Sequence, residues 1–277
     1  MRRIIYDSWG QMCNRLWEYL DQVAWAYKTN NKVISWFWDY SLEDFDNLRK
    51  NDYIKFPFYI KYSQNSLIAR LYQYVLKRTL CNNFLRKVYS SVIFKKRGFI
   101  SSKDILFEHE HYSEVWHEIK GIFMPNKQIT ERIDPLFARM RHNEIIKIVG
   151  VHIRKGDYKN YCGGRFYYSD DEYRDYMRQI LMLIDGEVYF FIASNEKINR
   201  SKFEEFALAD IVNSKPAEDM YCLSKCDYII GPYSSFSYWA SFFNSVPLCT
   251  LFKGRQIKME DFRIISSFEH APESKNK

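Results

Sequence analysis

Long apolar runs are missing from this sequence of 277 residues. No run approaches the roughly 18 apolar residues that a membrane-spanning helix needs, so we expect no transmembrane segment. The stretch from Met1 to Asp7 contains too short an apolar core for a signal peptide. Both absences predict a cytoplasmic protein, at most peripheral on the inner face of the cell membrane.

Paired cysteines are missing as well. None of the six cysteines has Cys-x-x-Cys spacing, and Cys222 and Cys226, four residues apart, lie on a predicted helix. One such pair without a second is poor support for a zinc site. We therefore expect reduced, buried thiols and no bound metal or cofactor. The cysteines are Cys13, Cys81, Cys162, Cys222, Cys226 and Cys249.

Acidic residues are absent from Tyr53 to Lys103, although this segment contains eleven basic residues. The net charge of the chain is +7, so the rest of it carries −4. A single basic segment on a mildly acidic protein indicates a local anionic partner. The basic residues are Lys55, Lys61, Arg70, Lys77, Arg78, Arg86, Lys87, Lys95, Lys96, Arg97 and Lys103.

Within this basic segment, apolar residues between Ser66 and Phe94 recur with roughly helical spacing. Two interpretations are open. Amphipathic helices with few acids can lie on anionic membranes, which would make residues 66–97 a peripheral membrane contact. A solvated pair of helices with basic outer faces would give the same pattern.

The length suits two domains, and the 47% content of hydrophobic residues is enough to bury a core in each. We predict an N-terminal domain over residues 1–142, with a basic helical insertion at about 53–103, and a C-terminal domain over residues 143–277. Aromatic residues make up 18% of the chain, which suits carbohydrate stacking and ordinary packing equally.

Both halves alternate predicted strands and helices, which is typical of parallel sheets covered by helices. The first half begins with a strand at 3–6, a helix at 14–28 and a strand at 33–37. A helix at 131–143, interrupted near Pro135, leads into the second half. There we predict strands at 145–153, 188–193, 211–212, 228–230 and 247–251, and helices at 169–184, 201–206, 217–224 and 237–243. Ser169 and Glu172 have capping-box spacing at the start of the first of these helices.

Polar groups follow three predicted strands of the second half, and parallel strands direct such groups to one ligand crevice. His152 to Asp157 offers a guanidinium fork and an ammonium suited to phosphate oxygens. Ser194 and Asn195 can hydrogen-bond a ribose or a base, and the segment 231–237 places hydroxyls at a helix N-terminus, a natural phosphate site. Each segment also has an ordinary structural interpretation: a surface salt bridge for 152–157, a turn for 194–195 and a helix cap for 231–237. The ligand site is therefore predicted from the convergence of the three segments.

These segments resemble a known family. The string Val-His-Ile-Arg-Lys-Gly-Asp-Tyr at 151–158 resembles the His-x-Arg-Arg-x-Asp motif of the α1,2-fucosyltransferases, glycosyltransferase family 11, which are related to α1,6- and protein O-fucosyltransferases. The block at 218–240 is similar in the order of its Asp, its Cys and its Ser-Ser-Phe-Ser-x-Trp. The loop at 10–16 resembles a degenerate Gly-Leu-Gly-Asn-Gln-Leu. The resemblance covers about 148–251 and, less closely, 1–40, and we find none between about 50 and 130.

The resemblance implies an α/β protein with a GT-B fold, in which two Rossmann-like domains face a cleft. It also implies an inverting, metal-independent transfer of L-fucose from GDP-fucose to a glycan hydroxyl, in an α1,2 linkage. The acceptor would belong to surface polysaccharide or oligosaccharide synthesis and could be lipid-linked.

By similarity, Arg154 would neutralise the β-phosphate and His152 would bind near it. Asp219 would contact the guanine. The donor-binding set is Gly10, Asn14, Lys155, Asp157, Ser194, Asn195, Asp219, Ser234, Ser235 and Phe236. Two departures stand out: Lys155 replaces the second Arg of the motif, and Met12-Cys13 replaces Leu-Gly.

Three points stay open from the residues alone. Asp7, Glu18 and Asp39 are candidates for the general base by position only. Asp44 and Asp46 have the Asp-x-Asp spacing of a metal-dependent glycosyltransferase, or form a solvated acidic loop. The basic segment could belong to a nucleic-acid-binding protein, although it contains no recognisable nucleic-acid motif, and we expect no nucleic acid.

Overall fold

A computed structural model describes residues 2–38, 40–61, 67–105, 111–141, 146–209 and 215–268. The chain forms two compact units, residues 1–126 and 127–277. Each contains its own parallel sheet of four strands. The predicted division near residue 142 falls two residues after helix α8 (Lys127–Met140), which packs in the second unit.

The first unit contains a sheet in the order β3-β2-β1-β4. The strands β1 (Arg2–Ile5) and β2 (Lys32–Ser35) and the connecting helix α1 (Met12–Thr29) confirm the predicted βαβ unit. The chain moves from β1 to β2 and β3 (Ile54–Lys55), and then returns to place β4 (Phe99–Ile100) on the other side of β1. The carboxyl ends of β1 and β4 therefore form a topological switch point.

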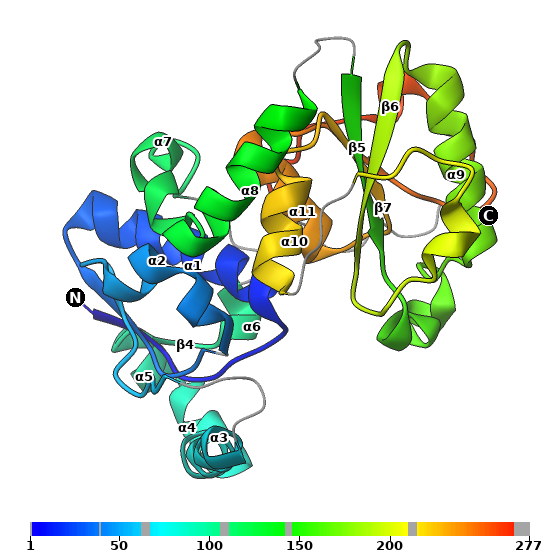
Figure 1. The fold of residues 1–277 in the computed structure, drawn as a ribbon. Helices are drawn as coiled ribbons and strands as arrows, with labels where there is room; N and C mark the ends of the chain where they lie inside the picture. The colour runs from blue at the N-terminus through cyan, green and yellow to red at the C-terminus, as the bar shows by residue number, and fades with distance from the viewer. Residues whose placement is uncertain are drawn as a thin grey trace. The chain divides into compact units, whose positions relative to one another are not determined.

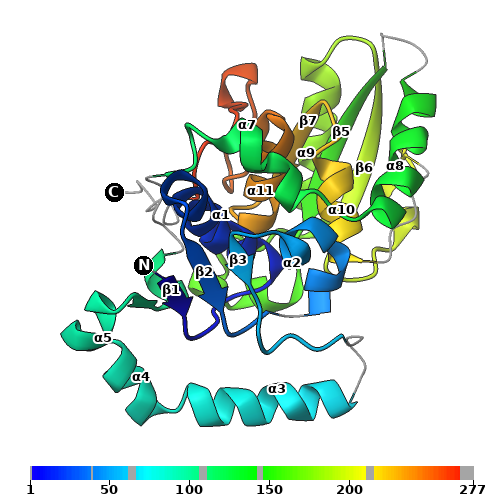
Figure 2. The same ribbon diagram turned by 90° about the vertical axis from the view of Figure 1, so that its left-hand side faces the viewer.

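Short helices complete the first unit. The predicted helical stretch between 66 and 94 consists of α3 (Leu67–Leu80), α4 (Asn83–Tyr89) and α5 (Val92–Lys96). Figure 2 shows α3 running along the border of this unit, beyond the sheet. The other elements are η1 (Tyr40–Asp44), α2 (Asp46–Lys50), α6 (Ser102–Ile105), α7 (Trp116–Ile119) and η2 (Lys120–Phe123).

The second unit contains a sheet in the order β6-β5-β7-β8, and all its strand pairs are parallel. The strands are β5 (Ile146–Ile153), β6 (Glu187–Ser194), β7 (Tyr228–Gly231) and β8 (Leu248–Thr250), which confirms four of the five predicted strands. The fifth, at 211–212, lies outside the described residues. The chain passes from β5 to β6 and then back across β5 to β7, so the switch point lies at the ends of β5 and β7.

Helices cover both faces of this sheet (Figure 1). Helix α9 (Asp170–Leu183) packs on one face through Tyr173, Met177 and Ile180, against Val149 and Val151 of β5. Helices α10 (Pro216–Leu223) and α11 (Ser235–Asn244) lie on the other. Because strand side chains alternate, His152 shares the second face with Gly150, where a Cβ atom would meet Leu223 and Cys226.

Two local predictions differ in detail. Helix α8 begins at Lys127 and continues through Pro135, because Ile129, Ile133 and Phe137 bury one face of it. The helix predicted at 201–206 is a short 3-10 turn, η5 (Arg200–Phe203). The capping box of Ser169 and Glu172 is confirmed. The remaining turns are η3 (Gly156–Lys159), η4 (Tyr161–Gly164) and η6 (Met259–Asp261).

In the described part of the chain, no helix is both long enough and apolar enough to span a membrane.

Candidate functional site

His152 is the penultimate residue of β5 and lies at the switch point of the second sheet. Its imidazole is 3% exposed and its Nδ1 has no hydrogen-bond partner. Burial, with a smaller contribution from the charge of Arg154, lowers the pKa of His152 to about 3. The side chain is therefore a neutral imidazole at physiological pH.

The loop after β7 packs directly on this histidine. The ring of Phe236 in α11 lies 5.0 Å from the imidazole, centroid to centroid. A Cβ atom on Gly231, the last residue of β7, would lie 2.8 Å from the Cβ of His152. Glycine at this position thus allows the ends of β5 and β7 to approach closely.

Arg154 leaves β5 two residues later, with a side chain that is 16% exposed. Its guanidinium donates from Nε and Nη2 to the two carboxylate oxygens of Asp157, at 3.1 and 3.0 Å. It also lies over the ring of Tyr158, 5.3 Å from the centroid. The backbone N–H of Arg154 donates to the hydroxyl of Tyr173 in α9 at 3.3 Å. The arginine fork is therefore held at the end of β5 by its own loop.

Lys155, predicted to add a charge beside a ligand phosphate, is engaged elsewhere in this structure. Its ammonium donates to the carbonyl of Tyr168 at 2.8 Å and pairs with Asp170 at 2.8 Å. Asp170 also pairs with Lys202 at 2.7 Å. Burial would raise the pKa of Asp170, but the hydrogen bonds from both lysines lower it below its usual value. Lys155 thus anchors the loop to the start of α9.

The three strand-end loops are connected by hydrogen bonds. The backbone N–H of Lys155 donates to Asn195 Oδ1 at 2.8 Å, which joins the loops after β5 and β6. The hydroxyl of Tyr158 donates to the carbonyl of Tyr233 at 2.9 Å, which joins the loops after β5 and β7. Burial raises the pKa of Tyr158 to about 12, so this phenol keeps its proton. These bonds bring together the loops after β5, β6 and β7, as predicted.

Helix α11 begins within this cluster. Ser234 is its N-cap, and its hydroxyl accepts from the backbone N–H of Phe236 at 3.2 Å. Ser235 is the first helical residue and follows the cap directly. The N-terminus of a helix attracts anions through its N–H groups and its dipole. The start of α11 therefore adds positive potential beside His152 and Arg154.

A cavity of about 400 Å³ lies beside the end of β6. Ser194 and Asp219 line it, and Ser194 accepts from the backbone N–H of Glu196 at 3.2 Å. Apolar residues and two cations complete the wall: Phe190, Ile192, Ile198, Leu208, Ala209, Lys197 and Arg200, together with Glu196. The cavity combines an apolar body with two acidic and two basic groups, and its carboxylates suit a planar ligand with N–H donors.

The other predicted residues belong to the first unit. Gly10 has a φ of +70°, and a Cβ atom there would lie 2.2 Å from the amide nitrogen of Asn14, so the loop after β1 requires glycine. Asp7 accepts from Ser101 Oγ at 2.8 Å and from the backbone N–H of Ser102 at 2.7 Å. It therefore bridges the loops after β1 and β4 at the switch point of this sheet.

The remaining acidic candidates differ from Asp7. Glu18 is fully buried, and burial raises its pKa well above the usual value. Asp39 lies outside the described residues. Asp46 pairs with Arg49 at 2.7 Å in the first turn of α2, and Asp44 is buried. No group of three or more potential metal-ligating side chains occurs among the residues with a described placement.

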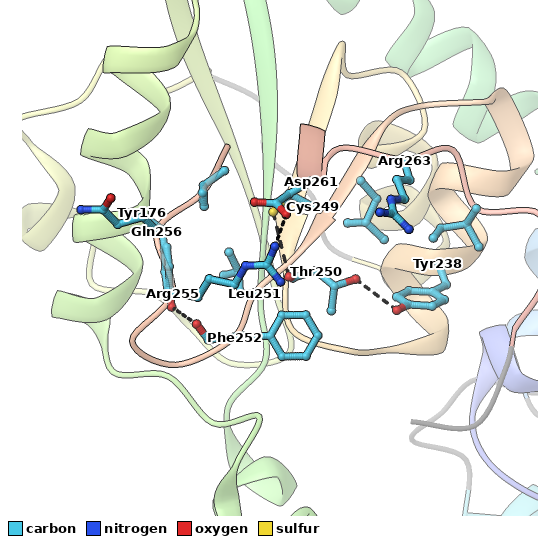
Figure 3. A pocket seen from close by; sticks show the side chains of 13 residues that line it. Tyr176, Tyr238, Cys249, Thr250, Leu251, Phe252, Arg255, Gln256, Asp261 and Arg263 are labelled. Atoms are coloured by element: carbon cyan, nitrogen blue, oxygen red, sulfur yellow. Dashed lines mark hydrogen bonds and ion pairs between the residues drawn. The ribbon is translucent and has the colours of Figure 1, made fainter. Parts of the chain in front are cut away.

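A second cavity, of about 280 Å³, lies between β8, α11 and the segment after β8 (Figure 3). Arg255 points to Asp261 and pairs with it at 2.5 Å, and Tyr238 shares a hydrogen bond with Thr250 at 3.1 Å. Its lining includes Cys249, whose pKa burial raises to about 12. Sequence reasoning missed this cavity because the segment after β8 was not among the three strand-end loops that it singled out.

Sequence reasoning also missed the residues that hold the loops together. Tyr158, Tyr173 and Asp170 support Arg154 and Lys155. Tyrosines of this kind have no recognisable spacing, and sequence analysis placed Asp170 only in the first turn of the helix predicted at 169–184.

Comparisons with known proteins agree with this arrangement. The family model described as glycosyl transferase family 11 matches residues 47–257, and so extends through the segment at 50–130 in which the motifs show no resemblance. No curated protein sequence matches the chain.

Solved structures resemble its fold. Fucosyltransferase NodZ from Bradyrhizobium is 14% identical, with a TM-score of 0.53 over 93% of this chain and 97% of that one. NodZ α-1,6-fucosyltransferase co-crystallised with GDP is 15% identical, with a TM-score of 0.53 over 90% of this chain and 94% of that one. POFUT1 in complex with GDP-fucose is 12% identical, with a TM-score of 0.52 over 92% of this chain and 98% of that one. The α/β fold is thus of the GT-B type predicted from the motifs. Because the family model covers most of the chain, including both the loop of Arg154 and α11, this protein belongs to glycosyl transferase family 11.

Proposed function

We propose that this enzyme transfers L-fucose from GDP-fucose to a hydroxyl group of a glycan acceptor. One observation carries the proposal: Arg154, His152 and the N-terminus of α11 converge at the switch point of the second sheet, since Arg154 lies over Tyr158, which bonds to Tyr233 just before α11. A nucleoside diphosphate is the ligand class whose charge and shape match that convergence. Membership of family 11 and the fold shared with fucosyltransferases support fucose as the sugar.

In the proposed complex, Arg154 binds the β-phosphate. Its guanidinium can exchange part of its bidentate contact with Asp157 for phosphate oxygens. Asp157 then acts as a positioning residue that keeps the fork at the end of β5. Ser234, Ser235 and Phe236 present the N–H groups at the start of α11 to the same phosphates.

His152 contributes as a neutral group. Its pKa of about 3 keeps the imidazole uncharged, so it binds the donor by a hydrogen bond and not by charge. A buried nitrogen without a partner costs about 1–3 kcal/mol. Nδ1 of His152 is such an atom, and a donor oxygen that bonds to it would recover part of that cost.

We assign the guanine to the cavity at the end of β6. Guanine offers two neighbouring N–H donors on one edge, and the Asp219 carboxylate can accept both. Uracil offers one N–H and a smaller ring. We propose that Ser194, which lines this cavity, and Asn195 beside it bond the ribose. Lys155 holds the loop through Asp170. Gly10 and Asn14 are proposed as donor-binding residues from the motif resemblance alone.

The reaction follows as a single displacement. The acceptor oxygen bonds to the anomeric carbon while the bond from that carbon to the β-phosphate oxygen breaks, which inverts the configuration. The electron pair leaves with GDP, and Arg154 and the N-terminus of α11 stabilise the growing charge without a metal. Among the described candidates for the general base we favour Asp7, because the Glu18 carboxyl is fully buried.

The acceptor side is proposed from the family alone. We propose an α1,2 linkage to a glycan, lipid-linked or free, in surface polysaccharide or oligosaccharide synthesis. The enzyme would work in the cytoplasm, with the acceptor at the inner face of the membrane.

The first experiment is calorimetric titration with GDP and with UDP, in EDTA. Micromolar binding of GDP corresponds to about 8 kcal/mol. We expect Arg154→Ala to weaken GDP binding about 30-fold or more, because it removes a charge-assisted bidentate contact. Arg178→Ala, which removes an exposed arginine of α9, is the matched control and should bind as the wild type does. Asp219→Ala should bring the GDP and UDP affinities together.

Preference for UDP, or a requirement for a divalent cation, would contradict the proposal. The sugar and the stereochemistry need a second measurement. GDP release from GDP-fucose should exceed release from GDP-mannose, and proton NMR of the glycan product should show inversion of the donor anomer.

A further inference from the structure

The outer face of helix α3 is apolar and exposed. Leu67, Ile68, Leu71, Tyr74 and Val75 have exposed fractions between 50% for Val75 and 81% for Ile68. Their spacing places them on one face of the helix. Soluble proteins normally turn such a stripe toward the core, so its exposure needs an explanation.

The opposite face of α3 is already attached to the first unit. The hydroxyl of Tyr72 donates to the carbonyl of Phe58 at 3.1 Å, and the amide of Gln73 donates to the carbonyl of Trp38 at 2.8 Å. Tyr72, Gln73 and Leu76 are half-buried. The helix is thus held through its more polar side, and its apolar stripe points away from the unit's core.

The next two helices continue this pattern. Phe84 of α4 and Val92 and Ile93 of α5 are each more than 60% exposed. Nearby aromatic residues anchor these helices, since Tyr89 stacks on Phe99 with centroids 5.3 Å apart. We call the eight exposed side chains the apolar ridge: Leu67, Ile68, Leu71, Tyr74, Val75, Phe84, Val92 and Ile93. They are half of the sixteen large exposed apolar side chains in the described part of the chain.

Basic residues accompany the apolar ridge. Between 67 and 97 the helices and their ends carry eight cations and no acid: Arg70, Lys77, Arg78, Arg86, Lys87, Lys95, Lys96 and Arg97. On α3, Arg70 and Lys77 border the apolar stripe along one side, and Arg78 lies within it beside Tyr74. Apolar side chains flanked by lysine and arginine are the pattern of helices that lie in the interface of an anionic bilayer.

We propose that α3, α4 and α5 form a lipid-binding surface that docks this enzyme on an anionic membrane. The apolar ridge inserts at the level of the acyl chains nearest the headgroups, and the cations contact lipid phosphates. A second copy of the chain is a poorer occupant, because a two-fold contact would bring the same positive charges together. A nucleic acid would use the cations but leave the apolar ridge in water. The inference goes beyond the proposed sugar transfer and does not depend on it.

Vesicle flotation of the full chain tests the proposal. Vesicles of phosphatidylcholine are compared with vesicles that also contain phosphatidylglycerol. We expect flotation with the anionic vesicles only. Ile68→Ser/Leu71→Ser/Val75→Ser should lower partitioning more than about 10-fold through lost apolar insertion. Arg70→Ser/Lys77→Ser should lower it about 30-fold. The control Leu181→Ser/Met182→Ser removes exposed apolar side chains of α9 and should float as the wild type does.

Other outcomes would overturn the proposal. These are flotation with phosphatidylcholine alone, no flotation with either vesicle, or flotation that neither variant changes. Two further results would assign the surface to another partner. One is self-association in sedimentation velocity, and the other is binding to duplex DNA. Either would have to occur without flotation and be lost in Ile68→Ser/Leu71→Ser/Val75→Ser. GDP binding and thermal unfolding are measured for every variant. Flotation without GDP binding would contradict the proposed function and leave this inference standing. Because the apolar and the basic residues are replaced in separate variants, misfolding of one variant leaves the other as a test.

Discussion

At the scale of single residues, the buried imidazole of His152 predicts a pH dependence of stability. Its pKa is about 3 in the folded chain and 6.5 in the unfolded chain, so the unfolded state binds the extra proton first. Its contribution to stability is fully present above pH 6.5 and is lost as pH falls toward 3. The free energy of unfolding should fall by about 1.4 kcal/mol per pH unit in that window from this residue alone.

The measurement is urea unfolding of the wild type and of His152→Asn at several pH values. The asparagine variant lacks the titrating group, so the difference between the two proteins isolates it from all other acid effects. The wild type should lose stability relative to the variant as pH falls from 6.5 to 4. A constant difference would mean that the imidazole is protonated, or reached by water, in the folded state.

The residues show what sequence reasoning can find. Arg154, His152 and Ser234 were identified because each lies at or just after the end of a buried strand, and strand order brings such positions to one edge. The side chain of Lys155 turns instead to Asp170, a residue fifteen positions away, and its direction depends on the packing of α9. The position of a side chain along an element can therefore be predicted from sequence more readily than the residue with which that side chain pairs.

At the scale of elements, the close approach of β5 and β7 predicts different results for two glycine substitutions. Gly231→Ala places a Cβ atom 2.8 Å from His152, whereas Gly150→Ala places one 2.6 Å from Leu223, on the same face but away from the loops. Both should lower the free energy of unfolding by about 1–3 kcal/mol through overpacking. Only Gly231→Ala should also weaken GDP binding, because it displaces His152.

Denaturant unfolding and GDP titration of both variants, below their unfolding midpoints, separate the two effects. Equal losses of GDP affinity would contradict a local role for the β5–β7 contact. If Gly231→Ala binds GDP as tightly as the wild type does, the displacement of His152 has no effect on donor binding.

Element prediction succeeded where burial follows periodicity and failed where tertiary packing decides. The strands of the second sheet are buried apolar runs, and their bounds differ from the predicted ones by at most about one residue. Pro135 was expected to interrupt a helix, but three buried side chains hold α8 across it. The helical period of α3 was visible, yet periodicity alone does not tell which side faces solvent.

At the scale of the whole molecule, the chain consists of two units, each with its own sheet and its own buried core. Chain length predicts two domains, but the sequence does not tell to which unit a connecting helix such as α8 belongs. Contacts such as the ion pair of Arg132 with Glu218, at 2.5 Å, join α8 to the second unit. A fragment that keeps this helix therefore keeps the contacts of α10.

This division leads to a last prediction. Residues 127–277, expressed alone, should unfold cooperatively and bind GDP with nearly the affinity of the full chain, because Arg154, His152, Asp219 and α11 all belong to that unit. The fragment should not transfer fucose, since Asp7 and the loop of Asn14 are absent. Calorimetry with GDP and an assay of GDP release from GDP-fucose test both statements on one preparation. A fragment of residues 143–277, which lacks α8, is the matched control and should be less stable, because α10 loses the ion pair of Glu218 with Arg132 and the hydrogen bond of Tyr221 to Asp134. GDP binding by the full chain that a folded 127–277 fragment fails to reproduce would contradict this account and would indicate that residues of the first unit, such as Asn14, supply much of the donor affinity.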